Sequence, residues 1–518
     1  MSFLIIASIL ISAAGISLEN YQTEEISISE FRDFTSGVYC AADLLNASEV
    51  ENDFVNNTLL TADILYPDSV TRHFYFVIPP GYDPEEPAPL FVWLHGGVST
   101  PDLRTMDSTD LSEWYLIPRL LEEGYLIAFP CAQLDAVWWD TVGETGIMSI
   151  VHWMKSTFRV DDSKVFVGGF SDGASGSFSL MMLHPDYFAA YMAFSGHIGV
   201  AALSNGRGTY LPSLSNRPGI VTHSDEDGLY PVAKMAPTIA LADEAGARIE
   251  YHTFSGFRHD PSYLPQIEDR VIEFLGATER IRFPENIIWE AGEPSGCDWL
   301  MVDSVISWPL IGEDRDYNTI LVSDRLQFGF FPDRDYEGNG VLIAGTLEGD
   351  VPAVRLELAE GDIITGFMNE PVSSLEDIGI LQSEMRAGDW FSMKIQREGE
   401  TIDLEDSFNP PEYYWLFPRE NPSVRVEAAY SDNHFNISVN RLCDIRLLLH
   451  PEMVDFNSNI VVTCNGLEIF SGKVIEDGNF AMNNFMEHLD MERCYTAELK
   501  LDIEELMPSL MYYRTGGE

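Results

Sequence analysis

The chain has 518 residues, with 83 Asp and Glu against 30 Lys and Arg, so its formal net charge is -53. A field of that sign repels nucleic acid and anionic membrane surfaces, and we expect neither as a partner. Hydrophobic residues make up 45% of the chain, which excludes an intrinsically disordered protein; this length predicts about three domains.

The N-terminus, MSFLIIASILISAAG (residues 1–15), carries an apolar run followed by small residues at 12 to 14. This order is typical of a signal peptide, although no Lys or Arg precedes the run. A short membrane anchor is the alternative, but the run is short for a bilayer. We therefore expect a secreted or periplasmic protein with no integral membrane segment after signal removal, followed by an N-terminal extension over residues 16–70.

Strand-like and helix-like segments alternate from residue 71 to 277. Strands are predicted over 72–80, 89–97, 125–130, 164–170, 188–196, 217–223 and 248–254, and helices over 111–124, 145–158, 175–184, 232–246 and 264–276. The predicted strands are apolar with little alternation, as expected when helices cover both faces of a parallel sheet. The pattern predicts a doubly wound α/β domain that binds its ligand at the carboxyl ends of the strands.

The stretch VFVGGFSDGASGSF (residues 165–178) contains the pattern G-x-S-x-G at Gly169, Ser171 and Gly173. At a nucleophile elbow, this pattern places a serine on a tight strand-to-helix turn. The small residues on either side let the backbone cross closely enough to expose the hydroxyl. An ordinary glycine-rich loop has the same appearance, so the other members of a catalytic site must decide between the two.

An activated serine needs a base and an acid that orients it, and α/β-hydrolases supply them in the chain order Ser, Asp or Glu, His. Asp227, in IVTHSDEDGLYPV, and His259, in EYHTFSGFRHD, follow Ser171 in that order, each just beyond a predicted strand. We expect Ser171, Asp227 and His259 to form a catalytic triad. Three substitutes remain open: Asp225 as the acid, and His223 or His252 as the base.

The segment WLHGG places Gly96 and Gly97 after another predicted strand. Such a loop provides one backbone N–H of the oxyanion hole, and the residue after the nucleophile provides the other. We therefore expect the N–H groups of Gly97 and Asp172 to bind the oxyanion, where the loss of one donor costs about 3 kcal/mol. Trp138 and Trp139 could wall an aromatic pocket, or could be a packing pair.

The segments LHGG, GFSDG, HSDEDGLYP and GFRHD together resemble the polyhydroxybutyrate depolymerase, feruloyl esterase and dienelactone hydrolase group of α/β-hydrolases. The family's acid segment H-G-x-x-D-x-x-V-P aligns with HSDEDGLYP and implies that the acid is Asp227. This chain departs from it at Ser224, where the family has Gly, and at Tyr230, where it has Val. Asp172 stands directly after the nucleophile, and its carboxylate is expected to alter the local field and hence the charge preference for substrate.

The resemblance implies a serine esterase that forms an acyl-enzyme on a small-molecule or polymer-linked ester. The alternatives are a serine peptidase of the prolyl-oligopeptidase type and a non-catalytic envelope adaptor. We expect no cofactor and no metal, because the chain has no P-loop, no dinucleotide fingerprint and no C-x-x-C pair among its six widely spaced cysteines. Several of the cysteines are expected to be buried.

The second half of the chain changes pattern. We predict a β connector over 278–320, a proline-rich linker over 403–422 and a β-rich C-terminal domain over 423–518. Between the connector and the linker, residues 321–402 resemble a PDZ domain of the bacterial protease type. The resemblance is carried by the segments EGDIIT and MNEPV and by the loop Phe328, Gly329 and Phe330. Leu356, Glu357 and Leu358 replace the family's A-G-L. The resemblance implies that this loop could receive the carboxylate of a peptide C-terminus.

Overall fold

The computed structural model describes residues 26–44, 57–107, 115–309, 317–323, 326–333, 335–383, 385–418 and 421–503; the predicted signal peptide lies outside them. The chain forms two compact units: residues 1–317 with 417–518, and residues 318–416. In the described ranges, no helix is long and apolar enough to cross a membrane.

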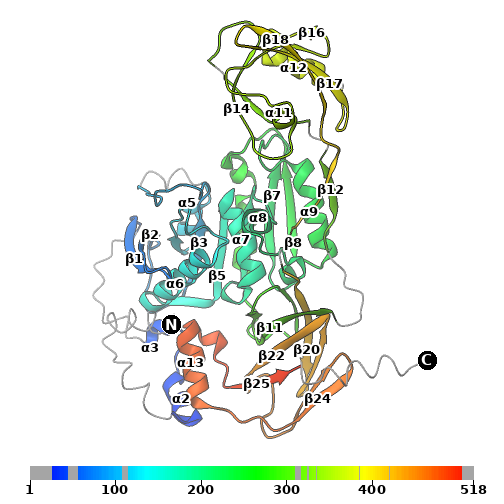
Figure 1. Ribbon diagram of the computed structural model, residues 1–518. Coiled ribbons are helices and arrows are strands. Elements are labelled where there is room, and N and C mark those ends of the chain that lie inside the picture. The colour runs from blue at the N-terminus through cyan, green and yellow to red at the C-terminus, as the bar shows by residue number, and fades with distance from the viewer. Residues whose placement is uncertain are drawn as a thin grey trace, which may run out of the picture. The chain divides into compact units, whose positions relative to one another are not determined.

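An eight-stranded sheet dominates the first unit (Figure 1). Its strands are β1 (Leu60–Leu65), β2 (Thr71–Val77), β3 (Ala88–Leu94), β4 (Leu126–Phe129), β5 (Val160–Phe170), β6 (Ala190–Phe194), β7 (Gly219–Ser224) and β8 (Ile249–Phe254). Their order is β1-β2-β4-β3-β5-β6-β7-β8; β2 is antiparallel to both neighbours, and β3 to β8 are mutually parallel. The predicted α/β domain with a mostly parallel sheet is confirmed, but the sheet begins at β1, inside the segment assigned to an N-terminal extension.

Helices flank this sheet on both faces. They are α5 (Ile117–Glu122), α6 (Thr141–Thr157), α7 (Asp172–Leu183), α8 (Val200–Asn205), α9 (Val232–Glu244) and α10 (Glu268–Ala277). Neighbouring residues of β2 show the two faces: Val77 belongs to a core that includes residues of α5 and α10, whereas the ring of Phe76 lies 5.2 Å from that of Trp153 in α6. Burial on both faces explains why these strands read as continuous apolar runs.

The connector and the C-terminal region form one β structure, not two separate parts. One sheet has the order β10-β11-β22-β25 and the other β24-β23-β21-β20-β9, with a single buried core. The strands are β9 (Asn286–Ala291), β10 (Ser295–Cys297), β11 (Leu300–Pro309), β20 (Val424–Ser431), β21 (His434–Val439), β22 (Arg441–Leu449), β23 (Ile460–Cys464), β24 (Leu467–Gly472) and β25 (Ala497–Asp502). The predicted connector and the predicted C-terminal domain are therefore joined by strand pairs, β9 with β20 and β11 with β22.

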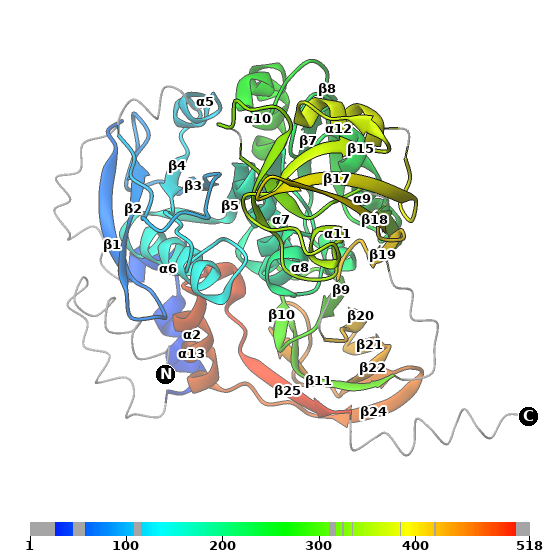
Figure 2. The ribbon, with the colours of Figure 1, turned by 45° about the horizontal axis from the view of Figure 1, so that its top comes forward.

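Two more helices lie beside this β structure. Near the N-terminus, α2 (Ile28–Thr35) packs against α13 (Gly478–His488), and Phe31 and Phe485 share their small buried core (Figure 2). The short helix α3 (Ala41–Leu44) follows α2. Residues from opposite ends of the chain thus stabilise the same corner of the first unit.

The second unit contains a β sheet with the order β13-β14-β15-β17-β18, to which β16 adds beside β15, and a separate ribbon of β12 and β19. Its elements are β12 (Ile320–Ser323), β13 (Phe330–Pro332), β14 (Val341–Thr346), α11 (Pro352–Arg355), β15 (Ile363–Phe367), β16 (Glu370–Pro371), α12 (Leu375–Gln382), β17 (Trp390–Arg397), β18 (Glu400–Ser407) and β19 (Glu412–Trp415). The segment predicted as a linker from residue 403 therefore contains most of β18 and all of β19.

Candidate active site

Ser171 stands at the turn between β5 and α7, as the elbow pattern predicts. Its backbone has φ 59° and ψ -120°, a left-handed conformation that a non-glycine residue adopts only under constraint. The Ser171 N–H donates to the carbonyl of Phe194, at 2.9 Å. A Cβ on Gly169 or on Gly173 would overlap the carbonyl oxygen of Leu94, so both glycines are required for the strand and the helix to approach this closely.

The structure brings Ser171, His259 and Asp227 into one hydrogen-bonded chain. His259 Nε2 lies 2.8 Å from Ser171 Oγ, and His259 Nδ1 lies 2.8 Å from Asp227 Oδ2. Ser171 follows β5, Asp227 follows β7 and His259 follows β8, so neighbouring carboxyl ends of the sheet place all three. This arrangement allows His259 to accept the hydroxyl proton while Asp227 fixes the ring through Nδ1–H.

Asp227 is buried, with 2% of its surface exposed. Its Oδ1 accepts hydrogen bonds from the backbone N–H groups of Leu229 and Tyr230, both at 2.8 Å. Burial alone would raise the pKa of Asp227, but these N–H groups and His259 outweigh it and hold the pKa below the ordinary value. The side chain is therefore a carboxylate at neutral pH, as the orienting acid of such a chain must be.

The three substitute residues do not reach Ser171. Asp225 is exposed, and its Oδ1 accepts a hydrogen bond from the Gly256 N–H at 2.8 Å. His223 Nε2 lies 2.8 Å from the carbonyl oxygen of Gly196, and burial lowers the pKa of this histidine. His252 pairs with Glu250 at 2.7 Å on β8. Asp225 thus contacts the loop that carries His259 without contacting His259 itself.

The two departures from the family's acid segment both contact the histidine loop. Ser224 Oγ donates to the carbonyl of Phe257 at 2.7 Å and accepts from its N–H at 3.2 Å. The ring of Tyr230 lies edge-on to the His259 ring, with centroids 5.6 Å apart, and Phe170 lies 5.1 Å from it on another side. The alignment marks these positions only as unusual; their contacts with residues about 30 positions away required the structure.

The loop after β3 is held by His95 and Trp138. His95 Nδ1–H donates to the carbonyl of Gly96 at 2.8 Å, and Nε2 accepts from the Ala132 N–H at 3.0 Å. Burial lowers the pKa of His95 to about 4, so the ring is neutral in both roles. Trp138 Nε1 donates to the carbonyl of His95 at 2.8 Å, and Trp138 and Trp139 are both buried, which favours the packing pair over the pocket wall.

The predicted oxyanion donors are close to Ser171, but one of them is engaged. A Cβ on Gly96 would lie 3.0 Å from Ser171 Cβ, so this loop runs beside the nucleophile. Gly97, with φ +70°, donates its N–H to Asp172 Oδ2 at 3.0 Å, and the Val98 N–H donates to the same oxygen at 3.1 Å. The Gly97 donor predicted for the substrate is thus bound to the side chain of Asp172.

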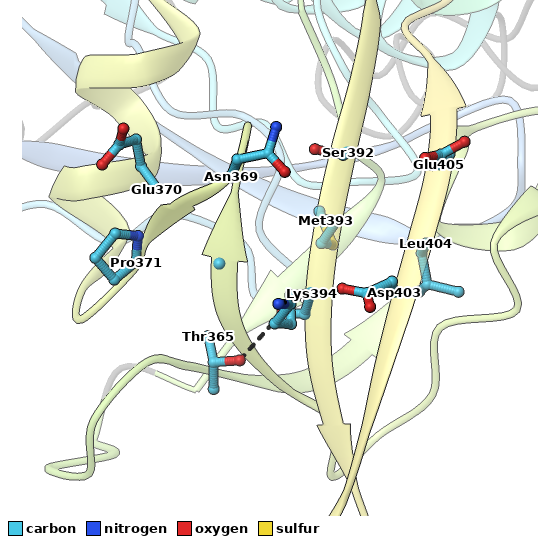
Figure 3. Close-up of a pocket in the computed structure, with 11 residues that line it drawn as sticks. Thr365, Asn369, Glu370, Pro371, Ser392, Met393, Lys394, Asp403, Leu404 and Glu405 are labelled. Carbon is cyan, nitrogen blue, oxygen red and sulfur yellow. Dashed lines mark hydrogen bonds and ion pairs between the residues drawn. The ribbon is translucent and has the colours of Figure 1, made fainter.

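In the second unit, a polar depression of about 540 Å³ lies over the strands β15 to β18 (Figure 3). It is lined by Thr365, Gly366, Asn369, Glu370, Pro371, Ser392, Met393, Lys394, Asp403, Leu404 and Glu405. Lys394 pairs with Asp403 at 3.4 Å, and no histidine or cysteine is among the lining residues. The depression therefore offers no nucleophile and base pair comparable to that of the first unit.

The loop Phe328–Phe330, predicted to receive a carboxylate, leads into β13, the edge strand of the sheet in the second unit. Phe328 is buried against the rings of Phe367, Phe391 and Phe408, while Gly329 has φ +86°.

Over the residues that the structure describes, no group of three His, Cys, Asp or Glu side chains could hold a metal ion. All six cysteines are buried and unpaired, as expected for several of them.

Part of the chain is similar to known esterases. An α/β-hydrolase family model described as phospholipase/carboxylesterase matches residues 144–276. Feruloyl esterase B of Talaromyces stipitatus is 34% identical over 118 residues, which cover 20% of this chain and 32% of that protein. A probable acetylxylan esterase A of Aspergillus flavus is 29% identical over 84 residues, covering 14% and 27%. The chain thus spans about a third of the length of these curated relatives, and the matches support an esterase.

The solved structures that align with part of the chain include esterases and peptidases. A thermostable esterase aligns with a TM-score of 0.36 at 19% identity, covering 43% of this chain and 63% of the other. A ferulic acid esterase aligns with a TM-score of 0.35 at 16% identity, covering 43% and 98%.

Proposed function

We propose that the protein is a serine hydrolase that cleaves carboxylic esters through Ser171, His259 and Asp227. The observation that carries the proposal is the continuous hydrogen-bonded chain from Asp227 Oδ2 through both nitrogens of His259 to Ser171 Oγ. The family model and the two curated esterases support the reaction class. The buried, ionised Asp227 supports the assignment of the acid.

In the proposed reaction, Ser171 Oγ attacks the ester carbonyl carbon as His259 Nε2 takes its proton. The tetrahedral intermediate collapses when the imidazolium gives that proton to the departing alcohol, which leaves an acyl group on Ser171. Water then attacks the acyl-enzyme with His259 again as base, and the acid is released. Throughout, Asp227 holds Nδ1–H and favours the imidazolium, and the backbone N–H groups beside Ser171 stabilise the oxyanion.

We further propose that the substrate is a small-molecule or polymer-linked ester and that the protein is exported. The N-terminal apolar run supports export. The names of the curated relatives refer to feruloyl and acetylxylan esters, which makes such esters the first substrates to try.

The test is labelling with a fluorophosphonate probe, comparing the wild type with Ser171→Ala, together with turnover of p-nitrophenyl and feruloyl esters. We expect labelling and turnover in the wild type and neither in the variant. A folded wild type that is neither labelled nor active would overturn the proposal and favour the adaptor alternative. Labelling that survives in Ser171→Ala would place the nucleophile elsewhere.

For the second unit we propose a PDZ-like module that binds a peptide C-terminus along β13. Two observations support it: the Phe328–Phe330 loop opens an edge strand, and Gln382 at the end of α12 donates to the carbonyl of Leu326 at 3.0 Å, tying helix to loop. Glu357 takes φ 54°, where the family's A-G-L has glycine.

The module is tested with the full chain and a fluorescent library of peptides, each prepared with a free and with an amidated C-terminus. Preference for the free carboxylate is expected, and equal binding of both forms would contradict it. In Gly329→Ala the new Cβ would overlap Val351, so binding should be lost. The control is Gly345→Ala on β14, whose Cβ would meet nothing closer than 3.9 Å.

A further inference from the structure

The carboxylate of Asp172 is bound by the loop that is expected to supply a donor to the oxyanion. Two consecutive backbone N–H groups, those of Gly97 and Val98, converge on its Oδ2 at 3.0 and 3.1 Å. The positive φ of Gly97 turns these donors to one side, which creates a small anion-binding concavity. The loop that carries them runs beside Ser171, with its Gly96 directly against the Ser171 side chain.

Oxyanion-hole donors lie about 2.7 to 3.1 Å from the oxygen that they stabilise. The two N–H groups are already at that distance from an oxygen of the right charge. Asp172 is the first residue of α7, and its backbone N–H is the expected second donor to the oxyanion. The side chain of the same residue accepts a hydrogen bond from the expected first donor, the Gly97 N–H. A substrate carbonyl must therefore compete with a carboxylate, which is the stronger acceptor.

We infer that Asp172 occupies the oxyanion site of the resting enzyme and is displaced by substrate, and that esters carrying a cationic group near the scissile carbonyl displace it best. This inference rests on the proposed function. Because Asp172 directly follows Ser171 in the chain, its carboxylate remains beside the nucleophile after it leaves the Gly97 and Val98 donors.

The charge preference follows from that position. A cation on the substrate pairs with the displaced carboxylate, compensates for the lost N–H donors and relieves the repulsion between the carboxylate and the developing oxyanion. A neutral ester gains none of this, and an anionic ester is repelled. The net charge of -53 acts in the same direction by attracting cations to the surface.

The test compares acetylthiocholine with its neutral isostere, 3,3-dimethylbutyl thioacetate, at low ionic strength. For the wild type, kcat/KM should favour the cationic ester by about tenfold. Asp172→Asn keeps the size and one acceptor oxygen but removes the charge, so the preference should fall by several-fold while turnover of the neutral ester rises. Glu226→Gln is the matched control: it removes one exposed charge from the loop of Asp227 and should leave the preference unchanged.

Four outcomes separate this inference from the proposed function. A wild type that is active without a cationic preference overturns the inference alone, and that measurement does not depend on how the variant folds. Slower turnover of both esters by Asp172→Asn at an unchanged ratio also overturns it, and would make Asp172 an anchor for the loop. Fluorophosphonate labelling that is faster in Asp172→Asn than in the wild type supports it. If neither protein is labelled, the proposed function fails and the inference fails with it.

Discussion

Buried carboxylates stand near both ends of strand β5, but their partners differ. Beyond its carboxyl end, Asp227 contacts His259, which contacts Ser171, and Asp227 also accepts hydrogen bonds from two backbone N–H groups. At its amino end, Asp162 lies 2.9 Å from Lys155, which also contacts Asp490 at 2.8 Å. Arg280, Arg493 and Asp186 complete this buried ion cluster.

The difference in partners separates function from stability. A histidine can take and return a proton near neutral pH, so the carboxyl end can move charge during a reaction. Lysine and arginine keep their charge, and the amino end holds the hydrolase sheet to the segment around Asp490 that precedes β25. We expect substitutions at the carboxyl end to change rate with little change in stability, and substitutions in the ion cluster to do the reverse.

Apart from removal of the nucleophile itself, the largest effect is expected from Asp227→Asn. The amide keeps the shape but cannot hold His259 in the same tautomer or support the imidazolium, and the corresponding change in serine proteases lowers kcat by about 10⁴-fold. Turnover of p-nitrophenyl acetate at fixed pH measures it, with a thermal melt to show that the fold is kept.

The matched control for that experiment is Asp225→Asn, two residues away. Asp225 contacts the histidine loop at Ser255 and Gly256, so we expect less than about a tenfold loss of kcat when its charge is removed. A larger loss in Asp225→Asn than in Asp227→Asn would assign the acid to Asp225.

Asp490→Asn should have the largest effect on stability. Burial alone would raise the pKa of Asp490, but Arg280 and Lys155 outweigh it and hold the pKa well below the ordinary value. Removing the charge takes away the ion-pair partner of Arg280 and leaves Lys155 with Asp162 alone. Breaking a buried ion pair in this way typically costs about 3–5 kcal/mol. Urea unfolding at neutral pH measures the loss; a change below about 1 kcal/mol would mean that the cluster is not coupled to folding.

Asp162→Asn tests the pH dependence of the same cluster. Burial raises the pKa of Asp162 to about 7; Lys155 opposes this and the Asp490 carboxylate adds to it. Since the folded-state pKa exceeds the unfolded one, near 3.9, this group's stabilising contribution is complete below about pH 4 and is lost as the pH rises through 7.

The asparagine imitates the protonated acid at every pH. From pH 5 to 7, the wild type should lose up to about 1.4 kcal/mol of unfolding free energy per pH unit through this group. The Asp162→Asn variant lacks that loss, so the difference in unfolding free energy, variant minus wild type, should rise by the same amount. Urea titrations of both proteins at pH 5, 6 and 7 give the difference. A difference that stays constant across that range would show that Asp162 is ionised throughout.

The sequence was sufficient where side-chain chemistry and strand order act together. Ser171, Asp227 and His259 each come after a strand of the parallel sheet, and parallel strands bring their carboxyl ends to one edge. The domain boundaries were harder, because β11 pairs with β22 about 140 residues later and the second unit lies between them in the chain. Nothing local to either segment specifies that pairing.

Asp172 shows a second limit. Its position after the nucleophile suggested a changed local field, but no sequence pattern indicates that its side chain turns back onto the Gly97 and Val98 N–H groups. That contact depends on the left-handed turn at Gly97 and on the angle between the two loops, which tertiary packing sets.

The smallest effect is expected from Ser224→Ala. Its hydroxyl joins the acid loop to the histidine loop through two hydrogen bonds with the Phe257 backbone. Losing them should cost about 1 kcal/mol and lower kcat less than tenfold, because Asp227 still holds His259 directly. Ser224→Gly, which restores the residue expected from the family resemblance, should behave like Ser224→Ala. If either variant instead lost activity as completely as Asp227→Asn, the hydroxyl of Ser224 would be as necessary for placing His259 as the carboxylate of Asp227 is.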